Sequence, residues 1–287
     1  MTEEEKITEP LPESADLEDE KIKVEKDVLE VPEEEEVVMT AEEAKLAKEL
    51  EGWKPKTKVG KMVQSKEITG MDQIFESGMN ILEPQITDML MPGLQKELLL
   101  IGQSKGKFGG GSRRIFKQTQ KKTPEGNNPS FACFAVVGNE DGYVGGGAGK
   151  SKDTVPAREK ATRNAKLNVF KIRRGCGSWE CGCKTPHSIP FEVEGKCGSV
   201  RIKLIPAPKG KGLCIEPECA KILKLAGIKD VWSKTFGQTK VKINLVKACM
   251  EALRELMKVK VHPNRYAALG IAEGRSTEIR SEEVKNE

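Results

Sequence analysis

Short apolar runs and alternating apolar residues predict five strands in the middle of the chain. The clearest are FACFAVVG, which ends at a turn-forming NEDG, and GSVRIKLIP, in which Val, Ile and Leu alternate with basic residues. We expect the turn before the second of these at Glu194–Gly195. The predicted strands cover residues 96–101, 131–138, 189–193, 197–206 and 228–232.

Apolar residues at helical spacing predict four helical segments. One has alanines at every fourth position from Ala157 to Ala165, a small-residue stripe suited to close packing on a sheet. Another begins at Pro217, a residue favoured in the first turn of a helix, and ends at Gly227. The remaining two cover 71–90, broken at Pro84, and 241–257.

Together these patterns predict an α+β protein built from two small folded units. Residues 1–39 hold no aromatic residue and are rich in acidic residues, so they cannot bury enough apolar surface to offset the entropy of ordering. The predicted organisation is an acidic, largely disordered extension (1–52), a basic linker with a helical segment (53–92), a first domain (93–170), a cysteine-rich connector (171–188), a second domain (189–258) and a loose C-terminal tail (259–287).

The net charge of +4 hides a strong asymmetry along the chain. Residues 1–51 carry 20 acidic against 6 basic residues, a net charge of −14, and residues 52–287 carry 24 against 42, a net charge of +18. A basic body of this kind favours a polyanionic partner, with a merely solvated surface as the alternative. The start of the chain has no signal-peptide pattern, and no apolar stretch reaches the roughly 20 residues that span a bilayer. We therefore expect no membrane partner.

A glycine-rich and cation-rich segment, 102–130, is the main candidate nucleic-acid contact. Its glycines allow a flexible backbone, its cations suit phosphates, and Phe108 and Phe116 could stack on unpaired bases. The alternatives are an exposed hairpin loop and a disordered loop. The candidate RNA-binding cations in this segment are Lys105, Lys107, Arg113, Arg114, Lys117, Lys121 and Lys122.

The run GGGAGKS (145–151) invites comparison with a phosphate-binding loop. Val144 occupies the place of the first glycine that such a loop requires, which argues against a nucleotide-hydrolysing enzyme. The other interpretation is a glycine-rich strand end that lets a second backbone come close, either protein or the phosphate chain of a nucleic acid. Further candidate RNA-binding cations lie here, in PAPKGKG and in KTFGQTKVK: Lys150, Lys152, Lys209, Lys211 and Lys234, with Lys240 and Lys242 close by.

The connector RRGCGSWECGCKTPH concentrates thiols, an imidazole and two arginines. Its three cysteines, with His187 or Cys197 as a fourth ligand, have enough donors for a structural zinc ion. The alternative is a set of reduced thiols in a packed loop. Bound zinc would stiffen the glycine-rich segment and direct Arg173 and Arg174 toward phosphate, so both arginines are candidate RNA contacts. The three candidate thiolate ligands are Cys176, Cys181 and Cys183.

Four blocks of sequence resemble the small-subunit ribosomal protein family numbered five in bacteria and two in eukaryotes, in its archaeal form. These blocks are GYVGGGAGKSKDTVPAREKATRNAKLNV, RRGCGSWECGCKTPHSIPF, EGKCGSVRIKLIPAPKGKGL and LAGIKDVWSKTFGQT, and the likeness covers about residues 67–257. The resemblance implies a double-stranded-RNA-binding-like domain followed by a small α/β domain of the family's C-terminal type. In the family, the loop that matches 102–130 reaches ribosomal RNA. This chain departs from the pattern by the extension QTQKKTPEGNNPS within that loop.

The resemblance also implies a role. The chain would be a non-enzymatic constituent of the small ribosomal subunit in the cytoplasm, bound to ribosomal RNA near the decoding region and the messenger RNA entry path, and supporting translational accuracy. Its neighbours would be the small-subunit proteins numbered three, four and eight. No cofactor would be required, with structural zinc as the one candidate. An enzyme that uses Lys150 and Ser151 for nucleotide phosphates, and a zinc-dependent protein-interaction module, are the competing functions.

Overall fold

The computed structural model describes residues 52–104, 106 and 112–274. The compact unit begins at Trp53, and the account below concerns that unit. The predicted disorder of the acidic extension therefore lies outside the described residues, as do Lys105, Lys107 and Phe108. None of the helices within the described ranges is long and apolar enough to cross a membrane.

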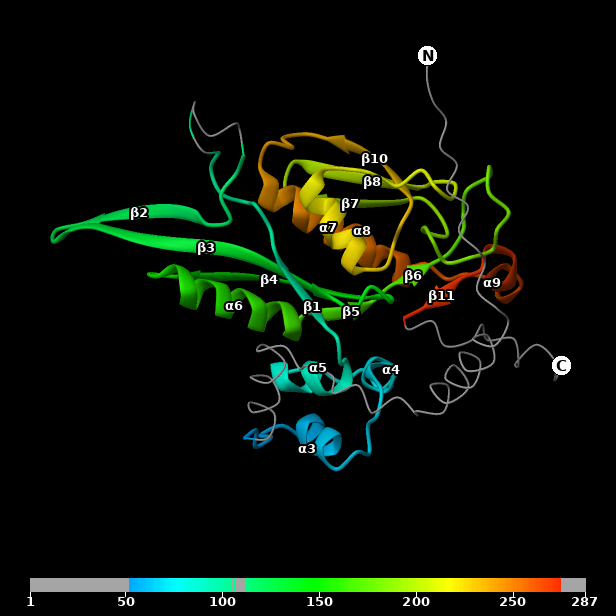
Figure 1. The fold of residues 1–287 in the computed structure, drawn as a ribbon, viewed down its shortest axis with the longest axis horizontal. Helices are drawn as coiled ribbons and strands as arrows, with labels where there is room; N and C mark the ends of the chain where they lie inside the picture. Colours follow the sequence, from blue (N-terminus) through cyan, green and yellow to red (C-terminus); the bar gives the residue numbers. More distant parts are fainter. Residues whose placement is uncertain (1–51, 105, 107–111, 275–287) are drawn as a thin grey trace, which may run out of the picture. The chain divides into compact units, whose positions relative to one another are not determined.

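A five-stranded antiparallel sheet forms the first domain (Figure 1). Its longest strand, β3, pairs with β4 over the predicted NEDG turn, where Gly142 has a positive φ of 90°. The order β1-β3-β4-β5 leaves the far half of β3 to pair with β2. The strands are β1 (Gln95–Leu98), β2 (Lys117–Thr123), β3 (Gly126–Gly138), β4 (Tyr143–Ser151) and β5 (Val169–Lys171), and helix α6 (Thr154–Leu167) follows β4.

Helix α6 packs against β4 at very short range because both contribute small residues. The predicted alanine stripe is fully buried, which confirms that prediction. A Cβ placed on Gly147 would lie 2.2 Å from the backbone nitrogen of Ala165, and one on Gly149 would lie 2.2 Å from the carbonyl oxygen of Ala157. The glycines thus make room for the backbone of α6, and for this reason they do not provide the approach to a nucleic-acid backbone that we considered.

The second domain packs on the opposite face of the first sheet. Side chains of β3 alternate between the two faces: Phe134 and Val136 join the core shared with the second domain, whereas Ala135 and Val137 join the core under α6. The second domain has a sheet of its own, with the strand order β7-β8-β10-β9 and with β9 parallel to β10. The elements are β7 (Val193–Cys197), β8 (Val200–Pro206), β9 (Leu213–Cys214), α7 (Pro217–Leu225), β10 (Val231–Phe236) and α8 (Lys242–Lys258).

The strands of the second domain begin later than predicted: the strand predicted at 189–193 is β7 at Val193–Cys197, and the one predicted at 197–206 begins at Val200. The turn lies at 198–199, where Gly198 has a φ of 61°, and not at Glu194–Gly195. Gly195 is instead buried inside β7. Only glycine fits there, because a Cβ would lie 2.1 Å from the carbonyl oxygen of Ala248 in α8. The strand predicted at 228–232 begins three residues later, and residues 228–230 form a loop that becomes important below.

Three short helices precede the sheet: α3 (Lys58–Gln64), α4 (Met71–Glu76) and α5 (Pro84–Leu90). Pro84 begins α5, so the predicted break of the 71–90 helix lies at that residue. Glu83 next to it accepts hydrogen bonds from the backbone nitrogens of Lys56 and Thr57 at 2.9 and 2.8 Å, and from Trp53 Nε1 at 2.8 Å. Burial alone would raise the pKa of Glu83, but these donors hold it below its usual value.

The expected loose tail is ordered over its described part. Residues 263–269 form helix α9 (Pro263–Leu269), and β11 (Ala272–Glu273) pairs antiparallel with β6 (Arg173–Arg174) of the connector. The sequence beyond 258 therefore folds back over the connector and closes a two-stranded sheet with it. Only Gly274 follows β11 within the described residues.

Candidate nucleic-acid interface

The β2–β3 hairpin carries the first group of candidate RNA-binding cations. Six of the seven residues of β2 are exposed. Lys117 pairs with Ala132, which pairs on its other side with Lys150. Because opposed residues on antiparallel strands point to the same face, Lys117 and Lys150 project together, about 10 Å apart across three strands. Lys121 shares that face, whereas Lys122 points to the other.

The residues predicted to extend the 102–130 loop form an ordered hairpin. The residues QTQKKTPEGNNPS supply most of β2 and the outer half of β3, and Gly126 has the positive φ of 122° needed at the turn. Figure 1 shows this hairpin running well beyond the rest of the sheet. Phe116 at its base is half-buried against the core under α6, so it does not offer a free ring for base stacking. The exposed-hairpin alternative therefore describes the fold of 117–130.

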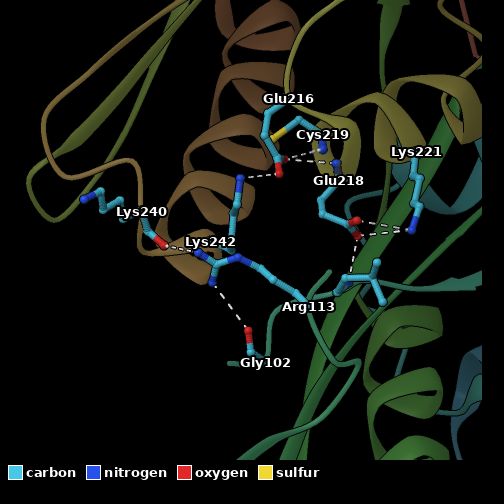
Figure 2. Close-up of polar contacts among 9 residues, drawn as sticks. Gly102, Arg113, Glu216, Glu218, Cys219, Lys221, Lys240 and Lys242 are labelled. Atoms are coloured by element: carbon cyan, nitrogen blue, oxygen red, sulfur yellow. Dashed lines mark hydrogen bonds and ion pairs between the residues drawn. The ribbon is translucent and has the colours of Figure 1, made fainter. Parts of the chain in front are cut away.

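A cleft of about 650 Å³ lies between the base of this hairpin and the start of α8. Figure 2 shows the Arg113 guanidinium reaching across it, donating to the carbonyl oxygens of Gly102 at 3.4 Å and Lys240 at 3.3 Å. Arg113 thus ties the two domains together at this point while keeping part of its surface in the cleft. The cations that line the cleft are Arg113, Arg114, Lys117, Lys240 and Lys242.

The acidic side chains near the cleft form hydrogen bonds and ion pairs with other residues of this chain (Figure 2). Glu216 accepts hydrogen bonds from two backbone nitrogens at the start of α7 and forms an ion pair with Lys242 at 2.5 Å. Glu218, which is buried, accepts from the backbone nitrogen of Leu100 at 2.7 Å and pairs with Lys221 at 3.2 Å. Since these carboxylates are neutralised locally, the exposed cations Arg114 and Lys117 keep the cleft positive.

One buried carboxylate holds the loop that carries Lys209 and Lys211 by hydrogen bonds to its backbone. Asp230 Oδ1 accepts hydrogen bonds from the backbone nitrogens of Gly210 and Gly212, at 3.0 and 2.8 Å. Both lysines are exposed above it. The candidate RNA-binding cations that are exposed in the described part of the chain are Arg114, Lys117, Lys121, Lys122, Lys150, Lys152, Lys209, Lys211 and Lys234.

Arg173 and Arg174 do not belong to this exposed set. Arg173, 9% exposed, pairs with Glu273 at 2.6 Å and donates to the carbonyl oxygens of Leu256 and Val259. Arg174, 5% exposed, pairs with Asp141 at 2.5 Å. The prediction that they face phosphate is therefore corrected: both guanidinium groups bind carboxylates and carbonyls inside the protein.

The phosphate-loop alternative is also excluded by the backbone. Residues 145–151 continue β4, paired with β3 as far as Ser151, so they form no loop around a phosphate. The enzymatic use of Lys150 and Ser151 depended on such a loop.

Four connector residues bring their ligand atoms together. The sulfur atoms of Cys176, Cys181 and Cys183 and a ring nitrogen of His187 all lie within 4.8 Å of one another. Cys197, the other candidate for the fourth position, lies at the end of β7 and is not part of this group. His187 Nε2 lies 3.8 Å from Cys181 Sγ.

The environments of the cluster's thiols differ. Burial raises the pKa of Cys176 to about 11, reinforced by hydrogen bonds with the other two thiols. A hydrogen bond with Thr185 Oγ1, 3.1 Å away, lowers the pKa of Cys183 to about 6. Cys176 is thus the buried thiol of the cluster, and Cys183 is the more exposed one.

The residue that the sequence analysis missed is Asp230. Its Oδ2 lies 2.8 Å from His187 Nδ1, so one carboxylate contacts both the imidazole and the lysine-bearing loop. The only local signal was a lone acidic residue in the segment LAGIKDVW, which by spacing alone points to no partner.

An α+β fold that presents exposed cations along a hairpin, a cleft and a glycine-rich loop has the character of a basic RNA-binding protein. Comparison with known families agrees. Residues 115–173 match the N-terminal domain of ribosomal protein S5, and residues 195–265 match its C-terminal domain.

Individual relatives extend this match over most of the chain. Proteins named small ribosomal subunit protein uS5 are 49% identical in Nanoarchaeum equitans over 225 residues, 44% identical in Methanocaldococcus jannaschii over 226, and 48% identical in Staphylothermus marinus over 209. These alignments cover 78, 79 and 73% of this chain and 96, 97 and 91% of the relatives. The chain belongs to the uS5 family of small-ribosomal-subunit proteins, which confirms the resemblance seen in its sequence.

Proposed function

We propose that the chain is a structural constituent of the small ribosomal subunit that binds ribosomal RNA through its exposed cations and catalyses no reaction. It would act in the cytoplasm, within the ribosome, near the decoding region and the messenger RNA entry path, and would support translational accuracy. The small-subunit proteins numbered three, four and eight would be its neighbours. The first domain would bind RNA as a double-stranded-RNA-binding-like module.

The observation that carries the proposal is the common face of Lys117, Lys121 and Lys150. Strand register directs these cations to one side of the sheet, Lys117 and Lys121 from the exposed strand β2 of the hairpin and Lys150 from the adjoining end of β4. A twisted β-ribbon with cations at spacings of several ångströms can follow a phosphate backbone, whereas protein neighbours would be expected to cover apolar surface as well.

The lysine-bearing loop at 207–212 adds a second contact point of the same chemistry. Lys209 and Lys211 are exposed, and the loop that carries them has a fixed conformation because two of its amides bind Asp230. A preordered loop loses less conformational entropy when it binds phosphate than a flexible one. The hairpin and this loop therefore support binding to more than one segment of the same RNA.

Neutralising the hairpin cations tests the proposal. We expect the variant Lys117→Gln/Lys121→Gln/Lys150→Gln to bind small-subunit ribosomal RNA more weakly and with a shallower dependence on salt, because each lost phosphate contact lowers the slope of log K against log salt by about 0.7–0.9. Loss of all three contacts would lower the slope by roughly 2–3. The measurement is the affinity for ribosomal RNA across a salt series, together with sedimentation of each protein with small subunits at moderate and high salt.

The matched control is Lys224→Gln/Lys229→Gln/Lys247→Gln, which removes the same charge from exposed positions outside the hairpin and the loop. It should keep the wild-type salt slope. The proposal fails if both triple variants behave alike, or if the wild-type chain stays at the top of the gradient at moderate salt.

A further inference from the structure

We propose that Cys176, Cys181, Cys183 and His187 bind one structural zinc ion, and that this ion, through His187 and Asp230, fixes the loop that carries Lys209 and Lys211. The proposal goes beyond the RNA-binding function, and its metal test gives the same answer whether or not the chain binds RNA.

The donor set and its compactness fit zinc. Three sulfurs and one imidazole nitrogen match the Cys₃His composition of structural zinc sites. A tetrahedral ion with ligand bonds of about 2.0–2.3 Å needs donor atoms about 3.5–3.8 Å apart. The four atoms lie within 4.8 Å of one another, and the Cys181–His187 pair is at 3.8 Å. Small changes in side-chain torsion would therefore complete the site.

The orientation of His187 is the strongest argument for a metal. Its Nδ1 lies 2.8 Å from Asp230 Oδ2, and both side chains are buried. The carboxylate fixes the tautomer with a proton on Nδ1, which leaves the lone pair of Nε2 directed at the cysteines. A carboxylate–histidine–metal arrangement of this kind is the usual outer shell of zinc sites.

The backbone around the cluster is already ordered. The amide of Cys176 donates to the carbonyl oxygen of Leu269 in α9 at 2.8 Å, and Gly175 pairs with Ser188 in an isolated β-bridge. The carbonyl oxygen of His187 accepts hydrogen bonds from the backbone nitrogens of Lys229 and Asp230, at 2.9 and 3.2 Å. The fold therefore holds the first and last ligands in place independently of the two between them.

Other chemistry explains the cluster less well. Iron–sulfur clusters are typically held by four cysteines, and this group has three. A redox pair would use the spacing Cys-x-x-Cys, which is absent from the connector. A packed set of reduced thiols needs no buried imidazole aimed at one of its sulfurs. Zinc is therefore the occupant that accounts for all four residues.

A zinc ion here would be linked to the loop that carries Lys209 and Lys211 through two side chains, those of His187 and Asp230. His187 would connect the metal to Asp230 Oδ2, and Asp230 Oδ1 binds the amides of Gly210 and Gly212. Ser188, next to His187, donates to the carbonyl oxygen of Asp230 at 2.5 Å and accepts from the amide of Ala207 at 3.3 Å. The metal thus stabilises the positions of the predicted phosphate contacts at 207–212, and not those of the buried arginines of β6.

The test is the metal content of the untagged full-length chain, purified from zinc-containing medium and measured by mass spectrometry. We expect about one zinc per chain in the wild type and in Cys197→Ser, and close to none in Cys181→Ser. Cys197→Ser is the matched control because it removes a partly buried cysteine that lies outside the cluster. Asp230→Asn should bind zinc roughly 10- to 100-fold more weakly.

Cobalt substitution of the wild type keeps the test valid if Cys181→Ser fails to fold. The expected result is a tetrahedral cobalt spectrum with thiolate charge-transfer bands, and zinc removal should speed amide exchange at Gly210 and Gly212. The proposal is overturned by a wild-type chain that carries no zinc, by zinc loss in Cys197→Ser, by iron in place of zinc, or by a disulfide among the cluster cysteines.

Discussion

Replacing Gly147 by alanine is expected to lower the free energy of unfolding by more than about 3 kcal/mol, although it adds a single methyl group. The new Cβ would lie 2.2 Å from the backbone nitrogen of Ala165 and 2.6 Å from the carbonyl oxygen of Ala161. Backbone atoms cannot rotate away as a side chain does. The helix must therefore move off the sheet, which opens the core formed by its alanine stripe.

The measurement is urea denaturation of the purified chain, with Gly70→Ala as the matched control. Nothing lies within 4 Å of a Cβ on Gly70, and its φ of −133° suits any residue. Gly70→Ala should therefore unfold within about 0.5 kcal/mol of the wild type. A Gly147→Ala protein of wild-type stability but with weakened RNA binding would instead support the interpretation that the glycines admit a nucleic-acid backbone.

Parts of this fold were predictable because local patterns and tertiary packing agree. The alternating residues of β8, the alanine stripe of α6 and the apolar side of α8 all follow from periodicity, and each lies where its pattern indicates. Pro217 and Gly227 mark the start and end of α7 in the same way. In these elements the residue types alone determine which side chains are buried.

The errors arise where a distant segment decides the outcome. Gly195 resembles a turn residue, but α8 packs so closely on β7 that only glycine fits inside the strand. For the segment 117–130 the composition left a binding loop, an exposed hairpin and a disordered loop open, and its polar residues pair as a hairpin across the turn at 124–125. No local signal marks Gly195 as a strand residue, since the deciding contact comes from Ala248 in α8.

The candidate RNA-binding residues also divide into cations that their local sequence leaves exposed and cations that a distant segment buries. Lysines on β2 and on the 207–212 loop are exposed, as expected from their glycine-rich and polar surroundings. Arg173 and Arg174 looked equivalent by sequence, but the partner of Arg173 is a carboxylate 100 residues further along the chain. Exposure therefore separates cations that can reach RNA from cations that hold the connector to the C-terminal segment.

Replacing Arg173 by methionine is expected to lower the free energy of unfolding by about 3–5 kcal/mol. The substitution keeps most of the aliphatic stem but removes a guanidinium that binds Glu273 at 2.6 Å and two carbonyl oxygens near the end of α8. Glu273, which also accepts from Tyr266 at 2.9 Å, would lose its cationic partner while still partly buried. Denaturant unfolding of the two proteins measures the difference.

This loss should depend on pH in a defined direction. Burial alone would raise the pKa of Glu273, but the hydrogen bonds from Arg173 and Tyr266 hold it below the usual 4.5. A lowered carboxylate pKa adds stability that is present above the unfolded-state value and is lost as the pH falls through the folded-state value. The difference in stability between the wild type and Arg173→Met should therefore be greatest near neutral pH and should shrink as the pH falls below about 4.5.

Lys209→Met is the matched control, because it also replaces one cationic residue by methionine, at an exposed position. It should unfold within about 0.5 kcal/mol of the wild type while reducing the salt slope of RNA binding by about 0.7–0.9, whereas Arg173→Met should leave that slope unchanged under conditions where it is folded. If the two variants exchanged these results, Arg173 would be an RNA contact after all. The same pair of measurements then distinguishes, for any cation of this chain, a role in the protein's own packing from a role at its RNA interface.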